Sequence, residues 1–215
     1  MFNIFKKKEK NSIENNNVNN QQYNNNLLNE FLNKFPPSQD LIKPDENIIN
    51  KYKDKLPQEI IDLWKNYGFG NYGDGLIKVI NPDDYLDNLF TWLGKEYDNY
   101  VPIMITAFGD IFYYRKLTDT ENDICMLSIH YRDIITCTYS YQEFFETYIV
   151  KDEIIKELLK KELFNEAINK LGKLTSEEIY YFVPALCLGG GENIKYIDKG
   201  KATVHQNILF QLGNK

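Results

Sequence analysis

The sequence predicts an α+β fold, with a mainly antiparallel sheet flanked by helices and a small C-terminal helical subdomain. Short aromatic or β-branched runs follow one another closely between residues 100 and 139, which leaves no room for helical crossovers and favours antiparallel pairing. Apolar residues recur at helical spacing on both sides of this region. The chain of 215 residues is 43% hydrophobic and 14% aromatic, which is enough to form a sizeable core.

Two helices are expected before the strands. The first should stop before Pro36-Pro37, because proline disfavours a helical residue in front of it. The apolar residues at helical spacing in it are Leu27, Leu28, Phe31, Leu32 and Phe35. The second has Pro57 in its first turn and Gly68 just past its end, both favoured positions. Its stripe consists of Leu56, Ile60, Leu63, Trp64 and Tyr67.

A glycine-rich loop, residues 68–75, follows the second helix and precedes a short strand at 76–80. Gly68, Gly70 and Gly73 match the pattern GxGxxG, but a dinucleotide site needs a strand before the pattern and a helix after it. The order here is the opposite. The pattern therefore indicates a turn that needs positive φ angles rather than a phosphate site.

Asn81-Pro82-Asp83-Asp84 is a strong helix start, with an N-cap side chain, proline at the first position and acids near the positive end of the helix dipole. The helix should run to about Leu93. Its buried face is expected to carry Tyr85, Leu86, Leu89 and Phe90, and its outer face Asp83, Asp84, Asp87 and Asn88.

Four strands are expected next, at 100–106, 110–117, 123–131 and 134–139. The third has apolar groups on both faces, so it should be a central strand covered on both sides. Ile124, Met126 and Ser128 share one face, and Cys125, Leu127 and Ile129 share the other. Asp110, which follows Gly109, is expected to fix the turn before its strand by bonding to its own backbone.

The C-terminal third should be helical. Ser140 to Glu143 is a capping box, and an apolar stripe from Leu159 to Leu171 ends at Gly172. A second capping box, Thr175 to Glu178, predicts a helix that ends at Leu186. A final helix is expected at about 203–212. The predicted organisation is an Asn-rich, ill-ordered arm at 1–26, an α+β domain at 27–150 and a helical domain at 151–215.

Charge and cysteine content exclude several classes of protein. The 25 basic and 31 acidic side chains give a formal net charge of −6, which disfavours non-specific nucleic-acid or anionic-membrane binding and suits a basic partner. The three cysteines form no disulfide framework or metal motif, so reduced thiols are expected. No apolar run is long enough to span a membrane, and the N-terminus lacks the order of a secretory signal. We expect a cytoplasmic protein.

Catalytic chemistry has little support. Cys125 and His130 are an odd number of residues apart on one predicted strand, so their side chains should point to opposite faces. Neither the two histidines nor the three cysteines have the spacing of a metal site, and no cofactor motif is found, so we expect no enzyme, metal or cofactor. One alternative stays open: a hydrolase or metal-dependent enzyme using Asp74, Asp110 or His205.

Acidic clusters are the remaining signal. One is formed by Asp83, Asp84 and Asp87, and the other by Asp119, Glu121 and Asp123 on a predicted hairpin. Each could be a solvated surface, a pair of carboxylates for acid–base or metal chemistry, or an interface for a basic partner. The pattern alone does not distinguish a solvated surface from an interface for a basic partner.

Several motifs resemble the GAD-like domain: LPQEIIDLWKNYGFGNYGDGL at 56–76, NPDDY at 81–85, TAFGDI at 106–111 and the strand at 126–131. The C-terminal part resembles the small helical domain that follows it in type VI secretion immunity proteins. That resemblance rests on 164–171, YFVPALCLGG at 181–190, Glu192-Asn193 and 205–212. The helix at 56–68 also resembles the SUKH superfamily, another group rich in immunity proteins.

The resemblance implies a non-enzymatic cytoplasmic immunity protein that occludes a cognate toxin, a nuclease with a basic cleft. The partner-binding candidates are two aromatic anchors expected in the exposed glycine-rich loop and four nearby acids: Phe69, Tyr72, Asp74, Asp83, Asp84 and Asp87. For the two aromatics, packing against their own domain is the alternative. The alternatives to immunity are the enzyme described above and a regulatory protein-interaction module.

Overall fold

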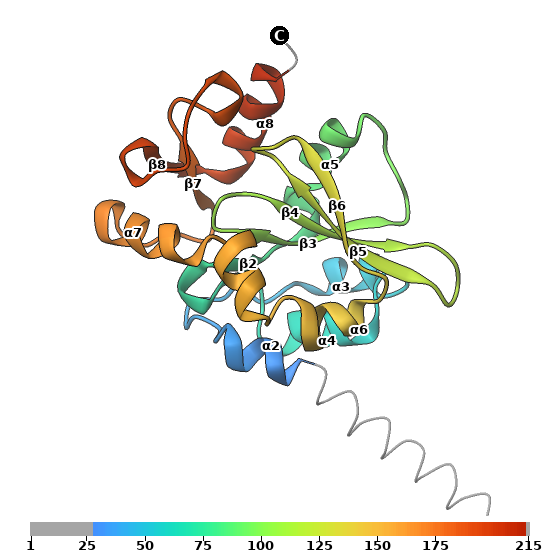
Figure 1. Ribbon diagram of the computed structural model, residues 1–215. Coiled ribbons are helices and arrows are strands. Elements are labelled where there is room, and N and C mark those ends of the chain that lie inside the picture. The colour runs from blue at the N-terminus through green and yellow to red at the C-terminus, as the bar shows by residue number, and fades with distance from the viewer. Residues whose placement is uncertain (1–27, 214–215) are drawn as a thin grey trace, which may run out of the picture.

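A six-stranded antiparallel sheet forms the centre of the molecule, with helices against both of its faces (Figure 1). The computed structural model describes residues 28–213, so the predicted arm at 1–26 lies outside the described residues. The strands are β1 (Gly70–Tyr72), β2 (Ile77–Val79), β3 (Tyr100–Thr106), β4 (Ile111–Lys116), β5 (Asn122–Ser128) and β6 (Asp133–Thr138). They lie in sequence order, and each pairs antiparallel with the next. The predicted fold class is confirmed.

Helical segments occur before, between and after these strands. The α-helices are α2 (Asn29–Lys34), α3 (Glu46–Tyr52), α4 (Gln58–Asn66), α5 (Leu86–Leu93), α6 (Tyr141–Glu143), α7 (Lys161–Leu171) and α8 (Ala202–Leu212). The 3₁₀ helices are η1 (Gly73–Gly75), η2 (Pro82–Asp84), η5 (Leu186–Leu188) and η6 (Ile194–Tyr196). The π-helices are η3 (Phe144–Tyr148) and η4 (Ile154–Leu158).

The two faces of the sheet carry separate hydrophobic cores. In Figure 1, α2, α4 and α6 lie below the sheet, whereas α5 and α8 lie above it. The lower core is rich in aromatic side chains from the helices, among them Phe31, Trp64 and Phe144. The upper core is smaller and includes Leu89 of α5 and Leu209 of α8.

β5 shows how one strand serves both cores. Ile124 and Met126 belong to the lower core, whereas Cys125, Leu127 and Ile129 belong to the upper core. Successive side chains of a strand point to opposite faces, so a strand between two cores must be apolar at nearly every position. The predicted two-sided burial of this strand is confirmed.

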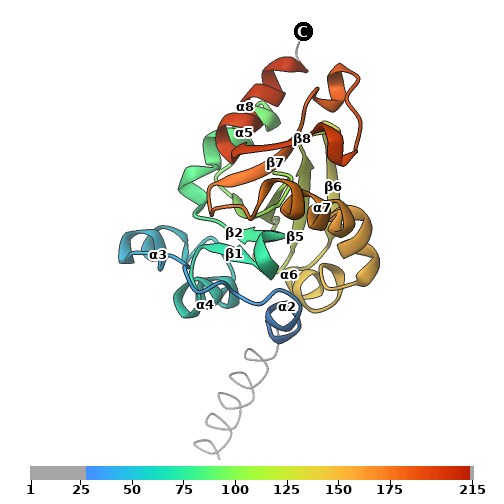
Figure 2. The same cartoon turned by 90° about the vertical axis from the view of Figure 1, so that its left-hand side faces the viewer.

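A hairpin of β7 (Glu178–Phe182) and β8 (Ile197–Lys201) lies between α7 and α8 (Figure 2). The helix predicted from the second capping box to Leu186 is therefore wrong. Glu178 Oε2 does accept from the backbone N–H of Thr175 over 3.0 Å, as a capping box would predict. The residues that follow, Ile-Tyr-Tyr-Phe, are strand formers, and pairing with β8 holds them extended.

Candidate partner-binding site

A cavity of about 370 Å³ opens where the segment before α5 meets the hairpin and the start of α8. Its lining comes from both halves of the chain. From the first half come Ile42, Phe69, Gly70, Val79, Ile80, Asn81, Asp84 and Tyr85, and from the second come Ser176, Glu177, Lys201 and Thr203. The lining mixes apolar and charged groups, as ligand and side-chain pockets do.

The local sequence places Asp84 at this cavity. The Asn81 side chain accepts from the backbone N–H of Asp83 over 3.3 Å, and Pro82 occupies the first position of the turn η2. The N–H of Asp84 donates to the carbonyl of Asn81 over 3.2 Å, which closes the turn. Tyr85, next in the chain, is buried in the upper core and anchors the turn against the sheet.

The negative charge of Asp84 is only partly balanced by its surroundings. Partial burial raises its pKa, the Asn81 side chain lowers it, and the negative charges of Asp83 and Glu177 raise it further. Lys201 favours the charged form of Asp84, but it also pairs with Glu177 over 3.2 Å. A cation entering the cavity would meet two carboxylates that share one lysine.

The other predicted acids have different surroundings. Asp83 accepts from Lys51 Nζ over 2.6 Å and from the Tyr52 hydroxyl. Burial alone would raise its pKa, but these two donors outweigh that effect and lower it. Asp74 pairs with Lys173 over 2.9 Å, and that hydrogen bond lowers its pKa. Asp87 is exposed on α5, outside the lining of this cavity.

The expected exposure of Phe69 and Tyr72 is wrong. Only 9% of Phe69 is exposed, and its ring packs against Trp64 with centroids 5.2 Å apart. Tyr72 is fully buried and donates its hydroxyl to the carbonyl of Gly68 over 2.8 Å. Residues 70–72 form the strand β1 instead of a projecting loop. Both residues belong to the lower core, and Phe69 also lines the cavity.

Of the residues that line the cavity, sequence reasoning identified Phe69 and Asp84 as partner-binding candidates and missed the others, among them Glu177, Lys201 and Ile42. Glu177 was assigned to a helix start, and Lys201 had no recognisable motif around it. Ile42 is 64% exposed and lines the cavity beside Phe69, to which its backbone is bridged. The local signal for Glu177 is a second acidic position beside Glu178, but its electrostatic interaction with Asp84 depends on a contact between distant segments.

A buried polar contact joins the two halves close to the cavity. Lys78 of β2 donates to the Asn71 side chain and to the carbonyl of Thr175, the latter over 3.0 Å. Asn71 Nδ2 in turn donates to the carbonyl of Leu174 over 3.0 Å. Lys78 is fully buried, so these acceptors replace the water that it loses. These hydrogen bonds tie the segment that precedes Glu177 to β1 and β2.

The residues of the enzyme alternative do not come together. Asp74 is exposed and paired with Lys173, and His205 stacks on Tyr181 with ring centroids 3.6 Å apart. Asp110 is buried and lines a different cavity, which includes neither of the others. Within residues 28–213, no group of three or more His, Cys, Asp or Glu side chains is arranged to hold a metal ion.

Asp110 also departs from its predicted role. Its Oδ1 atom accepts from the backbone N–H of Ile129 over 2.9 Å and from Ser128 Oγ over 3.2 Å. The turn before β4 is held instead by Thr106 Oγ1, which accepts from the N–H groups of Phe108 and Asp110, each over 3.2 Å. Asp110 therefore joins β4 to the end of β5.

The fold is that of an α+β protein in which a meandering sheet carries an appended hairpin and terminal helix. Two family models match it in succession: residues 26–128 match the GAD-like domain, and residues 138–213 match the model described as "T6SS immunity protein Tdi1, C-terminal". Both matches are to the families that the resemblance predicted.

Among solved structures, the crystal structure of Atu4351 from Agrobacterium tumefaciens is similar, with a TM-score of 0.66 and 19% sequence identity. The match covers 85% of this chain and 88% of that chain, and at this identity it shows a shared fold. No curated protein matches the sequence. None of the helices in the described part of the chain has the length and hydropathy needed to cross a membrane.

Proposed function

We propose that the protein is an immunity protein of a type VI secretion system, which binds a cognate toxin in the cytoplasm and blocks it without chemistry of its own. The observation that carries this proposal is the match of residues 138–213 to the C-terminal domain of a T6SS immunity protein. The family likeness supports the class of protein. The partner's chemistry is inferred from the charge of the chain and of the cavity.

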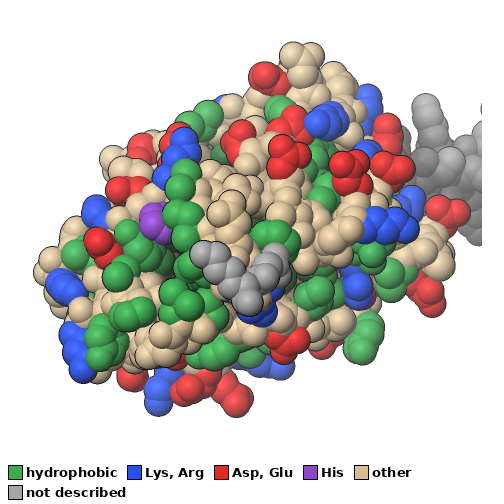
Figure 3. All heavy atoms as spheres, turned by 90° about the horizontal axis from the view of Figure 1, so that it is seen from above, with side chains coloured by type: hydrophobic (Ala, Val, Ile, Leu, Met, Phe, Trp, Pro, Cys, Tyr) green, Lys and Arg blue, Asp and Glu red, His purple; other side chains and the backbone are tan. Residues whose placement is uncertain are grey.

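The toxin that fits best is a nuclease, because a nuclease cleft must be basic to hold a polyanion. The net charge of −6 favours encounter with such a surface. Charges are not segregated everywhere: on the face drawn in Figure 3, acidic, basic and apolar side chains are interspersed. That face therefore offers no single-signed surface, which makes the cavity with Asp84 and Glu177 the better candidate for specific contact.

In the proposed complex, a Lys or Arg side chain of the toxin enters the cavity between Asp84 and Glu177. The alkyl part of this side chain would contact Phe69 and Ile42. Its positive charge would balance the second of the two carboxylates, because Lys201 can neutralise only one of them. Asp83 and Asp87 would contribute to the acidic rim. Occlusion of the toxin's substrate cleft then follows from the bulk of the bound protein.

The test is protection in cells. The protein is expressed with the toxin encoded beside it, and growth is compared for the unaltered chain, Asp84→Asn, Glu177→Gln and both together. We expect protection by the unaltered chain and its loss in the double variant. The matched control is Asp119→Asn, which removes one negative charge from a fully exposed hairpin residue far along the sequence from the cavity lining.

Failure of the unaltered chain to protect, together with failure of the purified pair to co-elute, would overturn the immunity proposal. Equal loss of protection in Asp119→Asn and Asp84→Asn would overturn the assignment of the cavity, because it would make overall charge the determinant. Recovery of a housekeeping protein in place of a toxin would favour the regulatory alternative.

A further inference from the structure

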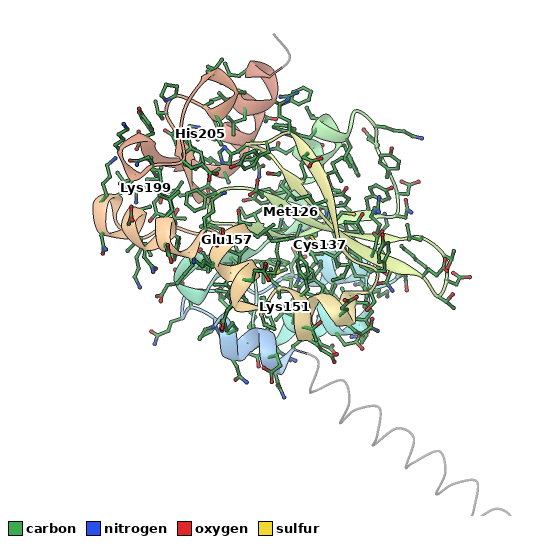
Figure 4. All side chains as sticks on the ribbon, in the orientation of Figure 1. Met126, Cys137, Lys151, Glu157, Lys199 and His205 are labelled. Atoms are coloured by element: carbon green, nitrogen blue, oxygen red, sulfur yellow. The ribbon has the colours of Figure 1, made fainter. Side chains whose placement is uncertain are left out.

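A second cavity, of about 320 Å³, lies between the lower face of β5 and β6 and the turn η4. Met126 of β5 and Glu157 of η4 line it, and both are labelled in Figure 4. It shares no lining residue with the cavity around Asp84. Nothing in the proposed binding of a toxin uses it.

The inner end of this cavity holds a buried carboxylate. Asp110 is only 4% exposed, and its Oδ1 atom accepts both of its hydrogen bonds, from Ser128 Oγ and from the N–H of Ile129. Among the described residues, no donor reaches the second oxygen, Oδ2. Oδ2 is accessible from the cavity, so it is the oxygen that a donor or a cation entering there can reach.

The cation that lines the cavity is already engaged. Lys160 Nζ pairs with Glu192 over 2.7 Å and lies 5.3 Å from the centroid of the Tyr131 ring. Burial raises the pKa of Asp110, while the charges of His130 and Lys160 and its two hydrogen bonds act in the opposite direction. Burial still dominates, so a further positive charge would stabilise the carboxylate.

The outer end is acidic as well. Glu153 and Glu157 line the cavity from exposed positions on and beside η4. The nearest cation to Glu157 is Lys156, at 3.9 Å, and both side chains of that pair are largely exposed. Between the two acidic ends the wall is apolar, formed by Met126, Ile135, Ile154 and Leu158.

We propose that this cavity binds a linear aliphatic diamine, with one ammonium on Asp110, the other between Glu153 and Glu157, and the alkyl chain against the apolar wall. The arrangement fits that chemistry in three ways. Each ammonium meets carboxylates, the methylene groups meet hydrocarbon, and the volume suits a chain of a few carbons. An uncharged diol of the same length would lose both ionic contacts.

The test is calorimetric titration of the full chain with 1,4-diaminobutane and 1,5-diaminopentane, compared with pentylamine and 1,5-pentanediol. We expect saturable binding of a diamine, weaker binding of the monoamine and no binding of the diol. The isosteric Asp110→Asn and the exposed pair Glu153→Gln with Glu157→Gln should each weaken diamine binding by about tenfold or more. Glu146→Gln, an exposed change outside the cavity, should leave it unchanged.

Absence of saturable diamine binding to the unaltered chain would overturn the proposal. Equal weakening by Glu146→Gln would overturn it too, because it would indicate diffuse attraction to an acidic protein. The Glu153 and Glu157 changes are exposed and outside the core, so the test stands even if Asp110→Asn does not fold. The readout needs no toxin, so this proposal and the immunity proposal can fail separately.

Discussion

Lys78 of β2 donates to the carbonyl oxygen of Thr175 over 3.0 Å, although 97 positions separate the two residues in the sequence. Lys78 is fully buried, and its contact with Thr175 crosses from the GAD-like segment to the Tdi1-type segment. The buried Lys78 side chain should have a measurable effect on the pH dependence of stability.

Stability should rise with pH just above neutrality because of Lys78. Burial lowers its pKa from 10.5 to about 7, so above pH 7 the unfolded chain binds more protons at this site than the folded chain does. The gain is at most about 1.4 kcal/mol per pH unit. Urea unfolding at several pH values between about 7 and 8 measures this rise in stability. At higher pH, thiols with raised pKa values, such as Cys137 with a pKa of about 12, lower the stability as pH rises, so the interval is kept below that range.

The matched variant is Lys78→Met, which keeps the stem and removes the titrating group. We expect its stability to be independent of pH over the same interval, and lower than that of the unaltered chain at pH 8, because Asn71 and Thr175 lose their donor. An unchanged slope in this variant would show that another group titrates.

Gln206→Leu should destabilise the fold by about 1–3 kcal/mol. Gln206 is buried in α8, where its Oε1 atom accepts from Asn88 over 2.7 Å and its Nε2 atom donates to the carbonyl of Gly109 over 2.9 Å. Leucine would remove the donor to the Gly109 carbonyl and one of the two acceptors of the Asn88 amide, which would keep only its bond to the carbonyl of Thr203 over 2.9 Å. Thermal or urea unfolding measures the loss, and Gln211→Leu, an exposed change on the same helix, should have little effect.

Gly109→Ala should cost more stability than Gly94→Ala, although both glycines have positive φ angles, +89° and +71°. A Cβ atom at Gly109 would lie 2.6 Å from Ile179 Cδ1 and 2.9 Å from Ile129 Cδ1, whereas at Gly94 it would meet nothing within 4 Å. The backbone strain is common to both, so the difference isolates overpacking, about 1–3 kcal/mol. Paired urea titrations give this difference, and equal losses would refute the packing argument.

Asp84→Asn should weaken the toxin complex by about tenfold, with a smaller effect at high salt. Asp84 and Glu177 share the positive charge of Lys201. Without the Asp84 carboxylate, Lys201 would largely neutralise Glu177, and a cation entering the cavity would meet little net negative charge. Binding kinetics at two salt concentrations measure this, with Asp119→Asn as the control. A Kd that does not change would place the contact elsewhere.

The sheet was predictable from sequence because its signals are local. The strands from residue 100 to residue 138 are β-branched or aromatic runs separated by short turns, and their spacing leaves antiparallel pairing as the only compact arrangement. The two-sided burial of β5 follows from alternation alone, since Met126 and Leu127 need opposite cores. The boundaries drawn at residues 26 and 150 remain predictions.

The candidate site was less predictable because contacts between distant segments decide it. Phe69 and Tyr72 are buried because the segment before α3 covers β1, with Ile42 bridged to Phe69 and Pro37 bridged to Tyr72. Nothing local to the glycine-rich loop indicates that cover. The hairpin β7–β8 was missed for a related reason: a capping-box pattern also fits a turn into a strand, and only the partner β8 decides between the two.

The contact between Lys78 and Thr175 also has a consequence for recombination of such a chain. A recombinant that joined this GAD-like segment to an unrelated second segment would lack the Thr175 carbonyl that accepts from Lys78 and the Leu174 carbonyl that accepts from Asn71. Such a hybrid would be less stable than the present chain, whatever partner it bound. The two segments therefore depend on each other for stability.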